Sequence, residues 1–208
     1  MNYYLDFDYT LFDTYAFREK LYKILERNGL DRTYLKLTPQ TENKEQKLLN
    51  IKELFNNLSI SKNIPIENFL KPLEDLYSKC SEFVYDDTIE FLNYLISKKH
   101  KLYILTWGDK EFQKEKIQAS GLYKYFDEII YAEQLKYMLD IDYENGIFID
   151  DSIRDLKGLY NKNAKKVFRI KRKNGKNSEK ELNIKEILEF NSLKELQIYL
   201  TSQEEQKQ

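Results

Sequence analysis

Short apolar segments alternate with amphipathic helical segments between residues 86 and 171 of the chain. The apolar segments are KLYILT (101–106), DEIIYA (127–132), GIFID (146–150) and KKVFRIK (165–171). Helical periodicity marks the segments 86–99, 109–121, about 133–142 and 152–163. Strands that alternate with helices form parallel sheets with helices on both faces. Right-handed crossovers place the carboxyl ends of all these strands at one edge, and ligands of such sheets bind at that edge.

The chain also begins with an apolar strand, YYLDF (3–7), that runs into two carboxylates one residue apart, Asp6 and Asp8. The other strand ends carry Thr106, Asp150 and Asp151. In a parallel sheet these four acids and one hydroxyl meet although they are far apart in the sequence. We therefore expect an α/β fold with an acidic site at the carboxyl edge of its sheet.

Carboxylates that converge in this way repel one another unless a cation lies among them. The chain has one histidine, His100, and one cysteine, Cys80, which excludes a zinc cluster of histidine and cysteine ligands. Hard oxygen ligands favour Mg²⁺, which in turn attracts phosphate. An aspartate beside the metal can attack phosphorus, and a second carboxylate can protonate the leaving oxygen and later activate water. A threonine and a lysine would stabilise the remaining negative charge.

Three segments resemble motifs of the haloacid dehalogenase superfamily. LDFDYTLFDT (5–14) resembles the first motif, Asp-x-Asp-x-Thr at the end of a strand. LYILTWGD (102–109) resembles the second motif, and GIFIDDSIRDL (146–156) resembles the fourth, an acidic pair followed by a further acid. The resemblance covers residues 1–13 and about 86–171. It implies a Rossmann-like parallel sheet core of the phosphatase type with an inserted helical (C1) cap.

The resemblance implies a role for each residue of the site. Asp6 would be the nucleophile and Asp8 the general acid and base. Mg²⁺ would bind the Asp6 carboxylate, the Asp8 backbone carbonyl and the Asp151 carboxylate. Thr106 would bind phosphoryl oxygens together with backbone amides near Phe7 and Trp107. Asp150 or Asp155 would hold water bound to the metal.

Two positions depart from the family pattern. The residue between Asp8 and Thr10 is often glycine in the family and is Tyr9 here, which can contact the substrate or pack against the cap. The third motif is normally a lysine, often followed by proline, and no Lys-Pro follows Thr106. Lys136 in AEQLKYMLDI (132–141) is the expected equivalent. Lys110 and Lys114 are the alternatives.

Residues 14–85 show helical periodicity throughout and resemble the cap. The expected helices are 14–29, 44–58 and 65–83, with Pro72 kinking or splitting the last of them. The core would then comprise residues 1–13 and 86–201, and residues 202–208 would be a disordered tail. Arginines of the cap that can reach an anionic substrate are Arg18, Arg27 and Arg32, although each can equally be a surface residue. Asp86 or Asp87 is expected to cap the next helix.

The composition bears on compartment and partners. A net charge of −1 over 208 residues gives no electrostatic reason to expect nucleic acid as a partner. No stretch approaches the ~18 apolar residues that span a membrane, and no signal peptide is apparent, so the cytoplasm is the expected compartment. We expect a monomer or weak dimer. The basic segment 162–180 is expected to be a solvated strand edge and loop, or alternatively a contact for a phosphate-rich partner, with a hairpin turn at 174–175.

These features predict a Mg²⁺-dependent phosphatase that hydrolyses a small phosphorylated metabolite, a phosphomonoester, through an aspartyl-phosphate. Two alternatives stay open: a phosphomutase of the same superfamily, and a binding or regulatory protein that keeps the fold without turnover. A dehalogenase is disfavoured because that reaction releases no alkoxide that would need Asp8 as an acid.

Overall fold

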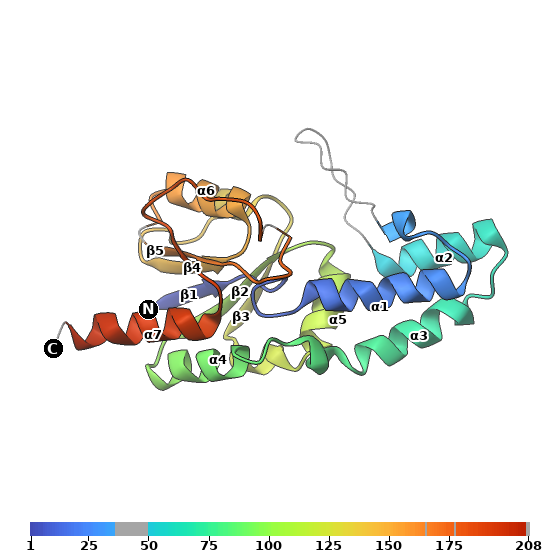
Figure 1. Ribbon diagram of the computed structural model, residues 1–208, viewed down its shortest axis with the longest axis horizontal. Coiled ribbons are helices and arrows are strands. Elements are labelled where there is room, and N and C mark those ends of the chain that lie inside the picture. The colour runs from blue at the N-terminus through green and yellow to red at the C-terminus, as the bar shows by residue number, and fades with distance from the viewer. Residues whose placement is uncertain (36–49, 165, 177, 207–208) are drawn as a thin grey trace. The chain divides into compact units, whose positions relative to one another are not determined.

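The computed structural model describes residues 1–35, 50–164, 166–176 and 178–206, and these form two compact units (Figure 1). The first unit comprises residues 1–15, 84–107 and 122–208, and the second comprises 16–83 and 108–121. The second unit therefore contains most of the expected insertion, together with the segment 108–121 that was expected in the core. No helix among the described residues has both the length and the apolar character needed to cross a bilayer.

The first unit is built on a six-stranded sheet in the order β3-β2-β1-β4-β5-β6, and every neighbouring pair is parallel. The strands are β1 (Asn2–Leu5), β2 (Lys101–Trp107), β3 (Glu128–Ala132), β4 (Gly146–Asp150), β5 (Lys166–Ile170) and β6 (Leu188–Phe190). The predicted α/β fold with a parallel sheet is confirmed. Tyr4 lies level with Tyr103 on one side and Phe148 on the other. The three rings stack at 4.9 Å between centroids, which ties the central strands together in one register.

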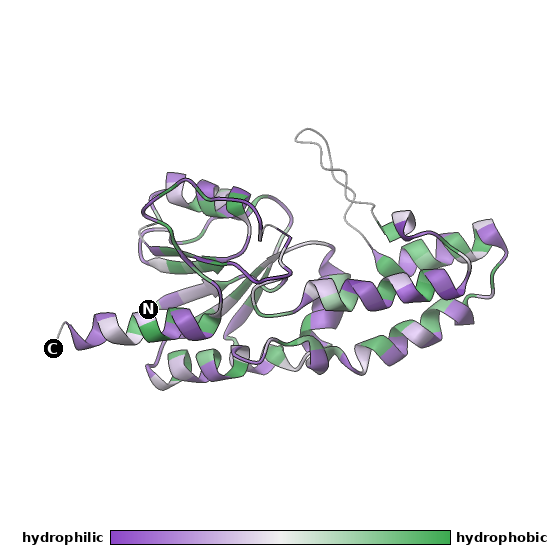
Figure 2. Ribbon diagram, in the orientation of Figure 1, coloured by the Kyte–Doolittle hydropathy of each residue, from purple (hydrophilic) through white to green (hydrophobic). Residues whose placement is uncertain are grey.

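Helices cover both faces of this sheet (Figure 1). They are α4 (Thr88–Ser97), α6 (Ile153–Asn161) and α7 (Leu193–Glu205), with the short 3₁₀ turns η3 (Leu122–Tyr125) and η4 (Lys136–Met138). Helix α6 packs on β4 and β5, whereas α4 packs on β2 and α7. Hydrophobic and hydrophilic colours share each helix in Figure 2, as expected of amphipathic helices with one buried face.

The second unit is helical. It contains α1 (Thr14–Arg27), whose first two residues belong to the first unit, with α2 (Ile51–Lys62), α3 (Glu67–Tyr77), α5 (Lys110–Ala119), η1 (Arg32–Leu35) and η2 (Cys80–Phe83). The predicted apolar face of α1 is buried, and Phe55 of α2 stacks on Phe69 of α3 at 5.1 Å between centroids. Cys80 is a buried free thiol, as expected. The first residues of the expected helix 44–58 lie outside the described residues.

Helix α3 continues through Pro72, so the expected split is not present there, and the expected kink stays a prediction. A proline has no N–H to donate to the carbonyl four residues earlier, which is that of Asn68. The side-chain amide of Asn28 donates to this Asn68 carbonyl at 3.3 Å. The partner lost at Pro72 is thus replaced from the turn that follows α1.

Three further expectations differ from the structure. The expected helix at about 133–142 is reduced to the single turn η4. The turn at Asn174–Gly175 is present, with the Gly175 N–H donating to the Arg172 carbonyl at 2.8 Å, but β5 and β6 are parallel, so it is not a hairpin. Helix α7 extends through Glu205, so residues 202–205 are helical rather than a disordered tail.

The basic segment is only partly a solvated loop, because Arg172 is buried. Its guanidinium donates to both carboxylate oxygens of Asp87 at 2.7 and 2.8 Å and to the Thr10 carbonyl at 3.0 and 3.3 Å. The guanidinium carbon lies 4.0 Å from the ring centroid of Tyr85. Asp87 precedes α4 but makes no cap hydrogen bond, and it also accepts from the Leu193 N–H at 2.8 Å. Arg172 thus joins the loop after β1, the start of α4 and the start of α7.

We predict that Asp87→Ala lowers the free energy of unfolding by about 3 kcal/mol, because it leaves the buried Arg172 charge without its partner. Urea denaturation measures this change. Asp86→Ala is the matched control, because Asp86 is exposed, and it should change stability by less than about 0.5 kcal/mol. Equal effects of the two substitutions would contradict the assignment.

Candidate active site

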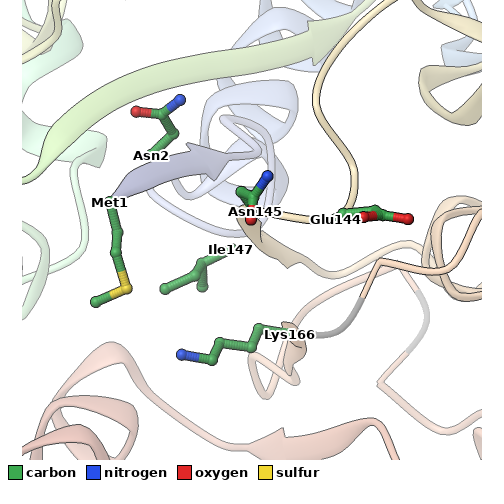
Figure 3. A pocket seen from close by; sticks show the side chains of 7 residues that line it. Met1, Asn2, Glu144, Asn145, Ile147 and Lys166 are labelled. Carbon is green, nitrogen blue, oxygen red and sulfur yellow. The ribbon is translucent and has the colours of Figure 1, made fainter.

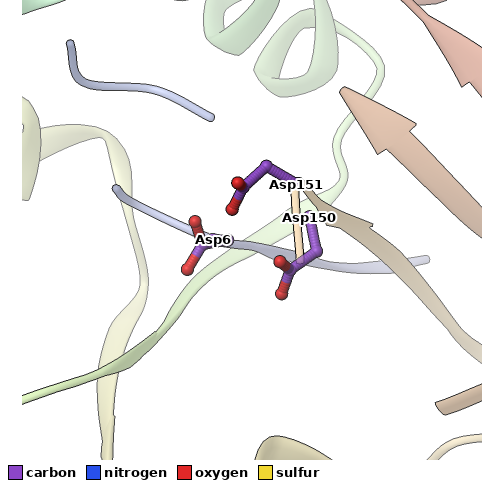
Figure 4. Close-up of side chains that lie close together, drawn as sticks. All are labelled: Asp6, Asp150 and Asp151. Carbon is purple, nitrogen blue, oxygen red and sulfur yellow. The ribbon is translucent and has the colours of Figure 1, made fainter. Parts of the chain in front are cut away.

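The sheet register brings Asp6 and Asp150 side by side. Leu5 pairs with Ile149, so the next residue of each strand stands at the same level, and the Asp6 N–H donates to the Ile149 carbonyl at 2.8 Å. Asp151 follows directly. One carboxylate oxygen from each of the three acids lies within 4.8 Å of the others (Figure 4). All three side chains are buried, so their mutual repulsion is poorly screened.

Lys136 enters this cluster from the segment that follows β3. Its Nζ donates to Asp6 Oδ1 at 2.5 Å and to Asp150 Oδ2 at 2.7 Å, and the residue is 2% exposed. The lysine expected in the third motif therefore contacts the expected nucleophile. Lys110 and Lys114, the alternatives, occupy exposed positions on α5 in the second unit.

Two aromatic residues hold the Lys136 segment in place. The Tyr143 hydroxyl donates to the carbonyls of Leu139 at 2.5 Å and of Lys136 at 3.3 Å. The ring of Tyr137 packs against Gly158 of α6 so closely that a Cβ at Gly158 would lie 1.9 Å from a ring carbon. Neither contact was foreseen from the sequence, although the glycine inside a helical pattern was a signal of close packing.

The ionisation of the cluster reflects burial and mutual charge. Burial raises the pKa of Asp6 well above its usual range, although the Lys136 ammonium opposes this. Burial likewise raises the pKa of Asp150, and the Lys136 ammonium again opposes the rise. Burial lowers the pKa of Lys136, but the carboxylates of Asp150 and Asp6 outweigh it and raise the pKa overall. Burial and the neighbouring Asp150 raise the pKa of Asp151 to about 7.

Asp8 is held by a threonine. The Thr14 hydroxyl donates to Asp8 Oδ1 at 2.5 Å. Tyr9 has a positive φ of 62°, a conformation that glycine adopts without strain, which explains why glycine suits this position. The Tyr9 N–H donates to the Phe12 carbonyl at 2.9 Å, closing the loop that carries Asp8. The expected contact of Tyr9 with substrate stays a prediction.

Thr106 lies at the expected edge, one residue before the end of β2. Its side chain is 1% exposed, and its Oγ1 has no hydrogen-bond partner among the described residues. A buried hydroxyl of this kind is costly unless a ligand supplies a partner. Trp107 follows it as the last residue of β2, and Phe7 lies between Asp6 and Asp8. Their roles as backbone donors to phosphate stay predictions.

Three of the remaining candidates, Asp155, Arg18 and Arg32, have local partners. Asp155 is buried in the first turn of α6 and accepts from Arg154 at 3.3 Å. In the second unit, Arg18 donates to the Tyr22 hydroxyl at 3.1 Å. Arg32 pairs with Glu19 and Glu26, and Arg27 is exposed.

The donor set fits a hard divalent cation. Three buried carboxylates and one lysine leave an excess of negative charge, and the ligand atoms are all oxygen.

A hollow of about 470 Å³ lies elsewhere, lined by residues at the amino ends of β1, β4 and β5, including Asn2, Gly146 and Lys166 (Figure 3). It includes none of the predicted site residues, so we place the chemistry at the carboxyl edge.

We predict that the effect of Asp151→Asn on stability depends on Mg²⁺ and on pH. A carboxyl whose pKa rises on folding favours the folded state at pH below its unfolded value, near 4, and this contribution is lost as pH rises through about 7. In EDTA at pH 8 the variant should therefore be more stable than the wild type by about 4 kcal/mol, and at pH 4 this difference should fall below about 1 kcal/mol. Urea denaturation at both values of pH measures it.

Millimolar Mg²⁺ should stabilise the wild type, by about 2.7 kcal/mol at a hundredfold excess over Kd, and should stabilise the variant far less. A wild-type protein that is indifferent to both Mg²⁺ and EDTA would contradict a metal site at Asp151.

We predict that Gly158→Ala destabilises the protein by about 2 kcal/mol through overpacking against Tyr137. Alanine normally stabilises a helix relative to glycine by about 1 kcal/mol. A decrease in the free energy of unfolding would therefore indicate overpacking rather than helix propensity. In a Tyr137→Ala background the ring is absent, and Gly158→Ala should become stabilising. If the alanine stabilises both backgrounds in urea denaturation, Gly158 does not hold the Lys136 segment.

Comparison with known proteins places this geometry in a family. The family model described as haloacid dehalogenase-like hydrolase matches residues 3–169. A search of curated protein sequences finds no match. Solved structures share the fold, among them a HAD phosphatase from Thermococcus onnurineus, with 19% identity, 96% of this chain and 97% of that chain covered, and a TM-score of 0.62.

Two further structures show the same likeness. A candidate HAD hydrolase from Bacillus subtilis, solved with magnesium, has 18% identity, covers 96% of this chain and 98% of its own, and has a TM-score of 0.63. L-2-haloacid dehalogenase from Xanthobacter autotrophicus has 15% identity and a TM-score of 0.59, and the match covers 96% of this chain and 98% of that chain. At these identities the likeness shows the fold alone. Together with the family match over residues 3–169, it shows that the chain belongs to the haloacid dehalogenase-like hydrolases.

Proposed function

We propose that the protein is a Mg²⁺-dependent phosphatase that hydrolyses a small phosphomonoester through an aspartyl-phosphate on Asp6. The observation that carries the proposal is the pairing of Asp6 with Lys136 at 2.5 Å, beside a second acid, Asp8, that is held by Thr14. The site thus contains a nucleophile, a positive charge and a separate proton donor.

The residues suggest two chemical steps. In the first, an Asp6 carboxylate oxygen attacks phosphorus, the bond to the leaving alkoxide breaks, and Asp8 gives that oxygen its proton. In the second, Asp8 takes a proton from water, the water oxygen attacks phosphorus, and the bond to Asp6 breaks. Inorganic phosphate and the free Asp6 carboxylate result. The hydrogen bond from Thr14 would keep Asp8 oriented for both proton transfers.

Lys136 and Thr106 would stabilise the phosphoryl group. Two carboxylates hold the Lys136 ammonium in position, so the side chain does not have to move when the phosphate binds. The unpartnered hydroxyl of Thr106 is a donor ready for a phosphoryl oxygen. Asp6 and Asp151 would hold Mg²⁺ with the Asp8 carbonyl, and the metal would supply electrostatic attraction for the phosphate oxygens. Asp150, whose contact is with Lys136, would position that lysine.

Asp8 separates this proposal from the alternatives within the family. Hydrolysis of a carbon–halogen bond releases a halide, which needs no proton, so that reaction gives no role to Asp8 as an acid. A mutase would use the same residues but return the phosphoryl group to a sugar hydroxyl rather than to water. A binding protein without turnover would need neither Asp8 nor its orientation. The expected role of residues 14–85 as a cap that selects the substrate, with Arg18 as a contact, is part of the same proposal.

We predict that Asp6→Asn lowers kcat for p-nitrophenyl phosphate by at least ~10³-fold, because an amide cannot act as the nucleophile. Phosphate release in Mg²⁺ and in EDTA measures the activity, and Asp86→Asn serves as an acid-to-amide control at an exposed position. Stoichiometric release of phosphate from a panel of metabolites distinguishes a phosphatase from a mutase. Near-wild-type activity of Asp6→Asn would refute the assignment of the nucleophile.

A further inference from the structure

Arg154 is an exposed cation at the edge of the site. It lies in the first turn of α6, which begins just after Asp150 and Asp151. Its guanidinium carbon is 5.6 Å from the ring centroid of Trp107, the residue after Thr106. The Arg154 side chain is 49% exposed. This pair therefore links the start of α6, the helix that follows β4, to the end of β2.

The other two arginines of the first unit are used differently. Arg169 and Arg172 are buried, and each pairs with a carboxylate and a backbone carbonyl. Arg154 makes one hydrogen bond among the described residues, to Asp155 Oδ2 at 3.3 Å. A guanidinium has five N–H donors, so most of those of Arg154 remain available to a ligand.

The contact with Trp107 orients these donors. A guanidinium lying over an aromatic ring is held by cation–π attraction, while its N–H groups remain available to bind a carboxylate or phosphate in bidentate fashion. This suits anion recognition better than a freely moving lysine on the same helix would.

Arg154 is connected to the acidic cluster through its neighbour Asp155. Its partner Asp155 interacts electrostatically with both Lys136 and Asp150. Lys136 and Thr106 account for the transferring phosphoryl group in the proposed function. An anion at Arg154 would therefore belong to another part of the substrate.

We propose that Arg154, supported by Trp107, binds a second anionic group on the substrate, so that the preferred phosphomonoesters carry a carboxylate or a second phosphate on the leaving group. This inference rests on the proposed function for the location of the first phosphate. The competing explanation is that Arg154 serves only to neutralise the buried carboxylate of Asp155.

Trp107 provides a direct test because it is the only tryptophan in the chain. We would titrate the protein in Mg²⁺ with 3-phosphonopropanoate and with propylphosphonate, which differ in the second anionic group and cannot be hydrolysed. Tryptophan fluorescence should report at least ~10-fold tighter binding of 3-phosphonopropanoate, as a charge-assisted contact provides. Arg154→Met should abolish this preference. Lys157→Met removes an exposed charge one turn along the same helix and should retain it.

The corresponding substrates separate this inference from the proposed function. 2-Carboxyethyl phosphate should have a higher kcat/KM than its neutral amide, 2-carbamoylethyl phosphate, and Arg154→Met should remove the difference while largely sparing the amide. A bisphosphate of 1,3-propanediol tests the second phosphate. Equal loss for both substrates in Arg154→Met, or no preference in the wild type, would overturn the inference. Selective phosphonate binding without any hydrolysis would instead contradict the phosphatase proposal.

Discussion

The structure of the site depends on one buried interaction, the contact of the Lys136 ammonium with Asp6 and Asp150. Burial of Asp6, Asp150 and Asp151 next to one another would be costly without an opposing charge. Lys136 supplies one such charge at 2.5 and 2.7 Å, and the remaining excess of negative charge is what suits the site to a divalent cation. Burial raises the pKa of Asp6, and the Lys136 ammonium opposes this rise, which favours the ionised carboxylate.

The surrounding fold serves to hold these groups in register. Parallel pairing of β1 with β4 sets Asp6 beside Asp150, and the stacked rings of Tyr4, Tyr103 and Phe148 fix that pairing. Lys136 comes from a segment with little regular structure, so its position depends on side-chain contacts. The Tyr143 hydroxyl and the packing of Tyr137 on Gly158 provide them.

Much of this arrangement was predictable because parallel sheets place strand ends together. The apolar runs predicted β1 to β5, and the acids at the ends of β1 and β4 predicted the cluster of Asp6, Asp150 and Asp151. Lys136 was proposed through resemblance to the third motif, although no Lys-Pro follows Thr106 and the spacing to Asp151 is short, and the structure places it against Asp6 and Asp150. The contacts of Arg172 with Asp87 and of Arg154 with Trp107 were not predictable. They join residues 85 and 47 positions apart, and a single arginine in a chain with 34 basic and 35 acidic residues carries no sign of its partner.

The central claim is that the Asp6 carboxylate carries a phosphoryl group during turnover. Asp8→Asn tests it most directly, because p-nitrophenolate leaves without a proton donor, whereas hydrolysis of the acyl phosphate needs a base. After incubation of this variant with p-nitrophenyl phosphate and Mg²⁺, mass spectrometry should find one phosphoryl group on the peptide containing Asp6, sensitive to hydroxylamine. A phosphoryl group on another residue, or turnover by Asp8→Asn at the wild-type rate without any adduct, would contradict the account.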